Sequence, residues 1–383
     1  MGFAFPICLL FLVYAGLIFV YRRNWKAVPG FEPGTRMPRT MISVLIPARN
    51  EEKNISHCLV SLDGQSYPHD RFEVLVLDDH STDGTVQAVR SFAGDLRLRC
   101  IPMADQPAPA TTRAFKKFAI DTGVRAAAGE LIVATDADCL FEPDWLLTMA
   151  AFYEEKNAKF IAAPVRIAAE GRAARGLLGI FQTLDFITLQ GITGASVHAR
   201  MHSMCNGANL AYSAKAFEEA EGFKGIDDIP SGDDLLLMHK IARLHPDKVF
   251  YLKSRRTIVT TGPASGWTAF LHQRIRWASK ADRYEDKRIF WVLLLVYIVN
   301  LMLAVLLAAA LFDRRWAWLF LILLVLKTAV EYPFVRDVAG FFGQRRLMVY
   351  FPLLQPLHIL YTIVVGWLGK FGSYDWKDRK INK

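Results

Sequence analysis

The stretch FEVLVLDDHSTDGT, residues 72–85, decides the fold that we expect for this chain. The short apolar run at 72–77 predicts a buried β-strand, and Asp78 and Asp79 follow at its end. The Ser, Thr and Asp side chains of the next turn can cap a helix that begins near Thr85. The stretch therefore predicts a strand, a turn and a helix, with two carboxylates where the strand ends.

The same alternation continues on both sides of this stretch. Residues 42–47, 96–101 and 130–135 have the character of strands, and helical patterns run to Leu62 and over 115–128. Strands that alternate with helices predict an α/β fold, Rossmann-like, with a mainly parallel sheet and helices on both faces. Ligands of such sheets bind beyond the carboxyl ends of the strands, so acidic residues at those ends are candidate site residues.

Four apolar stretches lie outside this region, at 3–20, 289–312, 316–330 and 349–368. A helix that spans a membrane needs roughly 20 mainly apolar residues, so each stretch is a candidate span. We therefore predict a fourfold division of the chain: an N-terminal transmembrane anchor at 1–22, a catalytic domain at 40–285, C-terminal transmembrane helices at 289–370 and a basic tail at 371–383.

The flanking charges predict the orientation of the chain. No cation precedes the first apolar stretch and no small-residue cleavage site follows it, so we expect a retained anchor rather than a signal peptide. The segment YRRNWK after it places the large domain in the cytoplasm, and we expect a protein of the bacterial inner membrane. Three further spans would leave the basic tail outside, against the same rule. Either 313–335 does not cross fully, or another stretch crosses as well.

Residues 175–200 are apolar with sparse polar side chains. Asp185 and Gln190 argue against a full span and favour an amphipathic helix in the headgroup layer, with a core helix as the alternative.

Cysteine usage and net charge exclude other classes of protein. Five widely spaced cysteines without a CxxC pair indicate neither a zinc site nor a disulfide framework. The formal net charge of +9 arises largely from cations beside the apolar stretches, which indicates lipid headgroups rather than nucleic acid as the partner.

The segment TDADC, residues 135–139, supplies a candidate metal site. Asp136 and Asp138 follow a predicted strand and can face one point where the chain bends. Mg²⁺ and Mn²⁺ prefer oxygen ligands, and Mg²⁺ is often held by one or two carboxylates and substrate phosphates. A surface turn is the alternative. The glycines form no phosphate-binding loop of the Walker or dinucleotide type.

A second acidic pair, Asp233 and Asp234, opens the helical pattern of SGDDLLLMHKI. Carboxylates at a helix N-terminus are favoured by the helix dipole, so capping is one interpretation. One cap would satisfy that need, and the other carboxylate could serve as a general base.

The segment HQRIRWASK, residues 272–280, joins cations to an indole ring. Gln273, Arg274, Arg276 and Trp277 can bind a departing diphosphate and stack against a sugar. A Trp–Arg belt at a membrane surface is the alternative.

These motifs stand in the order DDHSTDGT, TDADC, SGDDLLL and QRIRW over about 42–280, which resembles the family 2 glycosyltransferases. The similar branch carries QxxRW and includes cellulose, chitin and hyaluronan synthases and ceramide glucosyltransferase. The resemblance implies a GT-A fold, a UDP-sugar donor and inversion at the anomeric carbon by single displacement.

The resemblance also implies roles for individual residues. Asp234 would be the general base, with Asp233 in the place usually held by Glu, and Asp136 and Asp138 would hold the metal. The residues implied in nucleotide and donor binding are Ala48, Glu51, Asp78, Asp79, Lys116, Asp136 and Asp138. Those implied in the acceptor and diphosphate platform are Gln273, Arg274, Arg276, Trp277, Asn206, Gly207 and Asn209. Phe115 replaces the Gly that precedes the family's Lys.

We therefore expect a membrane-bound inverting glycosyltransferase that uses Mg²⁺ or Mn²⁺ and a UDP-sugar, with a lipid-linked acceptor. The few spans favour transfer of one sugar over a processive polysaccharide synthase. A sugar nucleotidyltransferase would want a Gly-rich loop near the first strand, and IPARNEEKN has no glycine. A non-catalytic scaffold would have lost an acidic motif, and all are present.

Overall fold

The computed structural model describes residues 4–107, 114–168, 176–201, 204–229, 232–279, 286–371, 374–376 and 379–381. The chain divides into two compact units. Residues 28–168 and 196–262 form the sheet unit, and residues 1–27, 169–195 and 263–383 form the helical unit.

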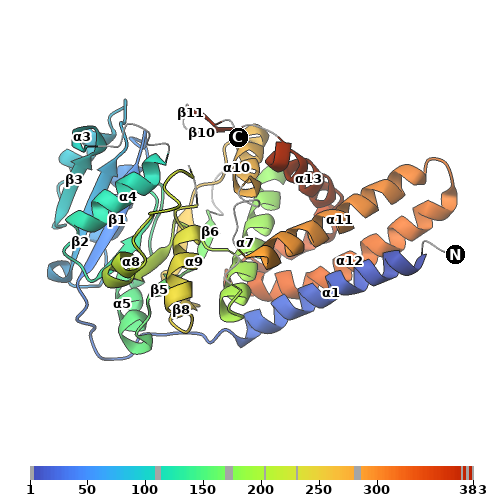
Figure 1. The fold of residues 1–383 in the computed structure, drawn as a ribbon, viewed down its shortest axis with the longest axis horizontal. Helices are drawn as coiled ribbons and strands as arrows, with labels where there is room; N and C mark the ends of the chain where they lie inside the picture. The colour runs from blue at the N-terminus through green and yellow to red at the C-terminus, as the bar shows by residue number, and fades with distance from the viewer. Residues whose placement is uncertain are drawn as a thin grey trace. The chain divides into compact units, whose positions relative to one another are not determined.

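A seven-stranded sheet is the centre of the sheet unit (Figure 1). Its order is β3-β2-β1-β4-β7-β5-β8; β7 is antiparallel to both of its neighbours and the other pairs are parallel. The strands are β1 (Ile42–Ala48), β2 (Phe72–Asp78), β3 (Leu98–Pro102), β4 (Leu131–Ala134), β5 (Phe160–Ala162), β7 (Leu210–Ser213) and β8 (Val249–Tyr251). The predicted α/β fold with a mainly parallel sheet is confirmed.

The helices of this unit pack apolar faces on the sheet. They are α2 (Ile55–Asp63), α3 (Thr85–Arg90), α4 (Phe115–Ala126), α5 (Trp145–Lys156), α8 (Ala214–Glu219) and α9 (Leu235–Leu244). In α2 the buried residues are Ile55, Cys58, Leu59 and Leu62, the spacing of one helix face. Gly123 lets α4 approach the sheet, because a Cβ there would lie 2.8 Å from Cδ1 of Leu77.

Small elements complete the sheet unit and the end of the chain. A two-stranded parallel sheet joins β6 (Val165–Ile167) and β9 (Val259–Thr261). Single 3₁₀ turns lie at His69–Arg71, Met103–Asp105 and Arg255–Thr257, and another, in the helical unit, lies at Arg345–Val349. Near the C-terminus β10 (Tyr374–Trp376) pairs antiparallel with β11 (Arg379–Ile381).

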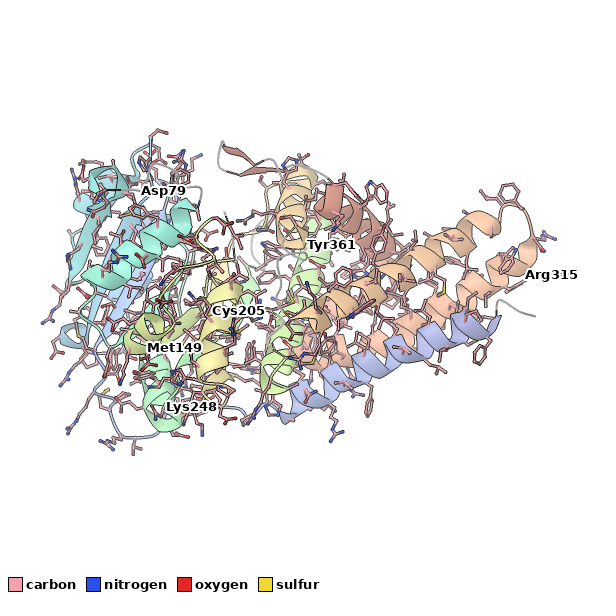
Figure 2. The ribbon with its side chains drawn as sticks, viewed as in Figure 1. Asp79, Met149, Cys205, Lys248, Arg315 and Tyr361 are labelled. Carbon is pink, nitrogen blue, oxygen red and sulfur yellow. The ribbon has the colours of Figure 1, made fainter. Side chains whose placement is uncertain are left out.

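The helical unit contains α1 (Ala4–Ala27), most of α7 (Leu177–His198), α10 (Trp267–Ala278), α11 (Lys287–Ala309), α12 (Arg314–Phe341) and α13 (Phe351–Phe371). Among the described residues, α1, α11, α12 and α13 are long and apolar enough to cross a membrane. Arg315 is exposed at the turn between α11 and α12 (Figure 2).

Helices α1 and α12 run side by side in the same direction. Tyr21 stacks on Phe334, Trp25 meets Phe341 edge-on, and Arg22 Nε lies 2.8 Å from Asp337 Oδ2. The C-terminal ends of both helices therefore lie together, and the cations after the first apolar stretch pair with an acid of α12.

The two buried charges of α12 neutralise each other. Lys327 Nζ lies 2.8 Å from Glu331 Oε1 one turn away, and it donates to Oε1 of Gln355 at 2.7 Å. Glu331 accepts hydrogen bonds from Gln355 Nε2 and from the hydroxyl of Tyr14. Because each charge is paired and hydrogen-bonded, α12 remains one continuous helix through an apolar surrounding.

Helix α7 differs from the amphipathic helix expected at 175–200. Between Phe181 and Val197 only Thr188, Leu189 and Ile192 are partly exposed, and Asp185 and Gln190 are buried. This burial is the pattern of the alternative, a core helix, and Asp185 has its partner Arg274 inside the helical unit.

Candidate functional site

Acidic side chains lie where β1 and β2 end. Ala48 is in register with Asp78, and the N–H of Asp79 donates to the carbonyl oxygen of Ala48 at 2.8 Å. Asp78 and Asp79 are each 5% exposed, and the Asp78 carboxylate accepts from the N–H of Ser81. The structure therefore brings together the three predicted residues from these two strands.

The loop after β1 is held against the loop after β2. Arg49 Nη1 donates to the carbonyl oxygen of Asp79 at 2.8 Å, and Oδ1 of Asn50 accepts from the N–H of Thr82 at 2.9 Å. The N–H of Glu51 donates to Oγ1 of Thr85 at 2.8 Å. Sequence reasoning missed Arg49 and Asn50. The available signal was the Asn directly after a predicted strand, because Asn tolerates the left-handed conformation, φ 52°, that it adopts here.

Asp136 and Asp138 lie directly beyond the end of β4. Asp138 Oδ2 accepts a hydrogen bond of 3.0 Å from Oγ1 of Thr261. Burial raises the pKa of Asp138, as do the neighbouring charges of Asp136 and Glu51, while the bond from Thr261 opposes the shift. Three carboxylates thus influence one another here, and nothing in the sequence around Thr261 pointed to its part.

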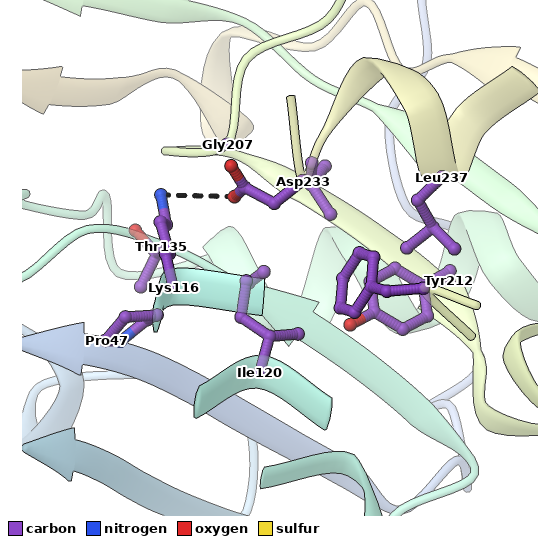
Figure 3. A pocket seen from close by; sticks show the side chains of 11 residues that line it. Pro47, Lys116, Ile120, Thr135, Gly207, Tyr212, Asp233 and Leu237 are labelled. Atoms are coloured by element: carbon purple, nitrogen blue, oxygen red, sulfur yellow. Dashed lines mark ion pairs between the residues drawn. The ribbon is translucent and has the colours of Figure 1, made fainter. Parts of the chain in front are cut away.

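Lys116 connects this site to the second acidic pair. Its Nζ lies 2.9 Å from Asp136 Oδ1. It also lies 3.3 Å from Asp233 Oδ2, the ion pair marked in Figure 3. Burial acts to lower the pKa of Lys116, but Asp136 and Asp233 outweigh it and raise the pKa. The ammonium is therefore charged and bridges segments that lie far apart in the sequence.

Asp234 is the N-cap of α9. Its Oδ1 accepts from the N–H of Leu235 at 2.7 Å, and its Oδ2 accepts from the N–H of Gly207 at 3.2 Å. A carboxylate has about four lone-pair sites, so lone pairs remain for a proton. Capping by Asp234 and pairing of Asp233 with Lys116 show that the two acids of this motif have different partners.

A small pocket opens beside these groups (Figure 3). Its polar lining includes Lys116, Thr135 and Asp233, and its apolar lining includes Ile120 and Leu237. Gly207 belongs to the wall, where a Cβ would lie 3.3 Å from Nζ of Lys116. The pocket therefore joins the charged bridge to the apolar interior of the sheet unit.

Asn209 does not contribute to a ligand surface. Its side chain is fully buried: Nδ2 donates to the carbonyl oxygens of Pro164 and Thr257, and Oδ1 accepts from Nε1 of Trp145. The polar atoms of the Asn209 side chain thus hold the fold, and its place in an acceptor loop stays a prediction. Oδ1 of Asn206 accepts from the N–H of Ala208 and shapes the turn that presents Gly207.

Arg274 also differs from its prediction as part of the platform. Its side chain is 2% exposed, its Nη2 lies 2.8 Å from Asp185 Oδ2, and its guanidinium lies 4.2 Å from the Trp277 ring centroid. Gln273 Oε1 accepts from Arg274 Nη1 at 2.8 Å. The alternation of charged and apolar residues could not reveal this, because the partner acid lies 89 positions earlier.

Gln273, Arg276 and Trp277 are partly exposed on α10, in the helical unit. The structure thus gathers Lys116, Gly207 and the acids of two motifs within the sheet unit, and it holds the QxxRW residues on one helix of the other unit.

The donor set beside β4 fits a divalent cation. Asp136 and Asp138 offer hard oxygen ligands, and a bound cation would oppose the burial and the charge of Asp136 that raise the pKa of Asp138. Within the described ranges no three His, Cys, Asp or Glu side chains are placed to hold a metal by themselves. The two carboxylates would therefore share such an ion with other ligands.

Comparison with known families gives two overlapping matches. Residues 43–218 match Glycosyl transferase family 2, and residues 131–368 match Glycosyl transferase family group 2. The second match covers more than half of the chain.

Proteins that are similar to the chain include two curated relatives and one solved structure. It is 33% identical over 106 residues to glycosyltransferase AglE of Haloferax volcanii, covering 27% of this chain and 33% of the relative. It is 27% identical over 300 residues to beta-monoglucosyldiacylglycerol synthase of Nostoc sp., covering 73% and 55%. The mannosyltransferase PcManGT of Pyrobaculum calidifontis, solved with GDP-Man and Mn²⁺, aligns with a TM-score of 0.57 at 22% identity over 92% of this chain and 96% of that one, a likeness of fold. The chain spans about a third to just over half the length of these curated relatives.

Proposed function

The chain belongs to the family 2 glycosyltransferases, and we propose that it is a membrane-bound inverting enzyme that moves one sugar from a UDP-sugar to a lipid-linked acceptor. The observation that carries this proposal is the bridge formed by Lys116 between Asp136 and Asp233, beside Asp234. It gathers around one pocket the two acidic motifs that the reaction needs.

The proposed donor site lies at the carboxyl ends of β1, β2 and β4. We assign Asp78, Asp79 and Glu51 to binding of the nucleoside, and Ala48 fixes the end of β1 against Asp79. Asp136 and Asp138 would hold Mg²⁺ or Mn²⁺, which when bound would neutralise charge on the diphosphate. Open α/β sheets bind ligands at this edge, which supports the assignment.

The proposed chemical step uses Asp234 as the base. Asp234 takes the proton of the acceptor hydroxyl, and the oxygen then attacks the anomeric carbon on the face opposite the diphosphate. The bond between that carbon and the phosphate oxygen breaks, its electron pair leaves with the nucleoside diphosphate, and the configuration inverts. Two backbone N–H groups fix the Asp234 carboxylate, so it needs little reorganisation to act.

The exposed side of α10 carries the residues that we propose for the diphosphate and the acceptor. We propose that Gln273 and Arg276 donate hydrogen bonds to the diphosphate and that the Trp277 ring stacks on the acceptor. Arg274 would act through its neighbours, since its ion pair with Asp185 orients the helix that carries them. Arginine suits this task because its planar fork matches phosphate oxygens.

A lipid acceptor is supported by two observations. Four helices of the described chain are long and apolar enough to cross a membrane. The Nostoc relative is named for a glycolipid, beta-monoglucosyldiacylglycerol, and it matches 73% of this chain. Mass spectrometry of membrane lipids from a host with and without the gene tests the proposal. We expect lipids heavier by one hexose or N-acetylhexosamine; a new polymer instead would favour a processive synthase, and no new product would contradict the proposal.

We further propose that the sheet unit faces the cytoplasm and that α13 returns to the side on which it begins. Phe351, at its start, packs on Tyr332 in the second half of α12. Near its end, a Cβ at Gly369 would lie 2.6 Å from Cβ of Ala278 in α10, which precedes α11. Both ends of α13 thus have neighbours near the same end of the helical unit, and the basic tail would stay in the cytoplasm as the charge rule prefers.

A further inference from the structure

Lys116 and a bound divalent cation would compete for the same carboxylate, that of Asp136. Its Nζ is 2.9 Å from Oδ1 of Asp136, the residue proposed as a metal ligand, and 3.3 Å from Oδ2 of Asp233. The Lys116 side chain is 22% exposed and that of Asp136 is 39% exposed, so both can be reached from solvent. The ammonium therefore already neutralises the carboxylate that the metal needs.

We propose that Lys116 is an exchangeable internal counter-ion, which occupies Asp136 in the ligand-free enzyme and passes to the diphosphate when the nucleotide and the divalent cation bind. This inference rests on the proposed function in taking Asp136 as a metal ligand. Beyond its contact with the donor, Lys116 would then control the order in which the nucleotide and the divalent cation bind.

The physical reason is competition between like charges. An ammonium and a divalent cation on the same carboxylate repel each other strongly at this separation, in a site that is partly shielded from water. A lysine has a flexible four-carbon stem, so its charge can move while its backbone stays in α4. The diphosphate supplies a new anionic partner, which allows Lys116 to release Asp136.

The surroundings favour an exchange over a permanent pair. Gly207 faces the ammonium without a side chain; a Cβ there would lie 3.3 Å from Nζ and 3.5 Å from Oδ2 of Asp233. The neighbouring Lys117 is different, because it is 2% exposed and its Nζ donates to the carbonyl oxygens of Ile226 and Ile229. Of these two adjacent lysines, Lys116 has its charge at the pocket and Lys117 holds a loop.

The test is a Mn²⁺ titration of the purified full chain without nucleotide, with free Mn²⁺ measured by electron paramagnetic resonance. We expect Lys116→Met to lower the Kd for Mn²⁺ by roughly tenfold or more, since it removes a like charge beside the site. Lys116→Arg keeps the charge and should bind as the wild type does. Lys215→Met is the matched control, because that side chain is 78% exposed and lies on α8.

A saturating concentration of UDP should reduce or reverse the advantage in Mn²⁺ affinity of Lys116→Met over the wild type. In the wild type, Lys116 then pairs with the diphosphate and releases Asp136. An unchanged Kd for Lys116→Met without nucleotide would overturn the proposal, provided that its unfolding temperature matches the wild type. Unchanged Mn²⁺ binding by Asp136→Asn would overturn it too, since the ion would then lie elsewhere. Failure to transfer a sugar would contradict the proposed function alone, because this titration needs no turnover.

Discussion

The main-chain N–H of Gly207 donates a hydrogen bond of 3.2 Å to Oδ2 of Asp234, across 27 positions of the sequence. This bond ties the turn before β7 to the N-terminus of α9. It also places a residue without a side chain next to Lys116 and Asp233, so the width of the pocket at this point depends on Gly207.

Gly207→Ala should slow sugar transfer by roughly tenfold with little change in the unfolding temperature, because small displacements of reacting groups are costly. The added Cβ would lie 3.3 Å from Nζ of Lys116, so the ammonium must shift. Initial rates of nucleotide release at saturating donor measure the effect. Gly262→Ala is the control, since no atom lies within 4 Å of a Cβ there. Equal rates for the two variants would show that the pocket wall tolerates a methyl group.

Arg274→Met should destabilise the protein by about 3–5 kcal/mol, because it leaves the Asp185 carboxylate buried without its partner. The double variant Arg274→Met, Asp185→Leu should lose less than Arg274→Met alone. Denaturant unfolding in detergent measures these differences. Arg125→Met provides the comparison, as its ion pair with Asp121 lies at the surface and should contribute less than about 1 kcal/mol. A double variant as unstable as the sum of its single variants would contradict coupling of the pair.

Much of the sheet unit could be predicted from the sequence. Short apolar runs predicted β1, β2 and β4 to within two residues, because buried parallel strands are nearly continuous apolar runs. The acids at the ends of these strands followed from the same reasoning. The partners of those acids could not be predicted. Thr261 reaches Asp138 from a strand 123 positions later, and no local pattern encodes such a contact.

In the helical unit the positions of the long helices could be predicted, but the burial of its charged residues could not. Hydropathy located its long helices, but residue types alone could not tell a surface cation from a buried one. Arg274 and Arg276 stand two positions apart; Arg274 is buried against Asp185 of α7, and Arg276 is partly exposed. Lys327 and Glu331 show the same limit. Their charges argue against α12 as a span, and no local pattern reveals that both bond to Gln355.

Lys327→Met should lower the unfolding temperature, because Glu331 would keep its charge in an apolar surrounding without the ammonium 2.8 Å away. Adding Glu331→Gln should recover most of the loss, since Gln remains able to bond Gln355 and Tyr14 while carrying no charge. Thermal unfolding in detergent compares the variants. A double variant less stable than Lys327→Met would show that the carboxylate itself is required.

Labelling of single cysteines tests the membrane arrangement. In a variant without the five native cysteines, Asp313→Cys should react with an impermeant maleimide on intact bacterial cells, because this residue is exposed at the turn between α11 and α12. Lys383→Cys should react only after lysis, since we propose that the tail is cytoplasmic. Labelling of Lys383→Cys on intact cells would instead indicate that α13 crosses the membrane.

We propose Asp234 as the base of a sugar transfer to a lipid. Asn caps helices about as well as Asp, so Asp234→Asn should keep α9 folded while it removes the proton acceptor. Asp228→Asn, an exposed acid six positions earlier, is the matched control.

In the direct measurement, the purified protein in lipid vesicles receives Mn²⁺ and labelled UDP-sugars, with labelled GDP-sugars for comparison. The label in the extracted lipids is then counted. We predict labelled lipid from the wild type and from Asp228→Asn, and a rate lower by roughly 10²–10⁴-fold from Asp234→Asn. Equal labelling by Asp234→Asn and the wild type would contradict the account.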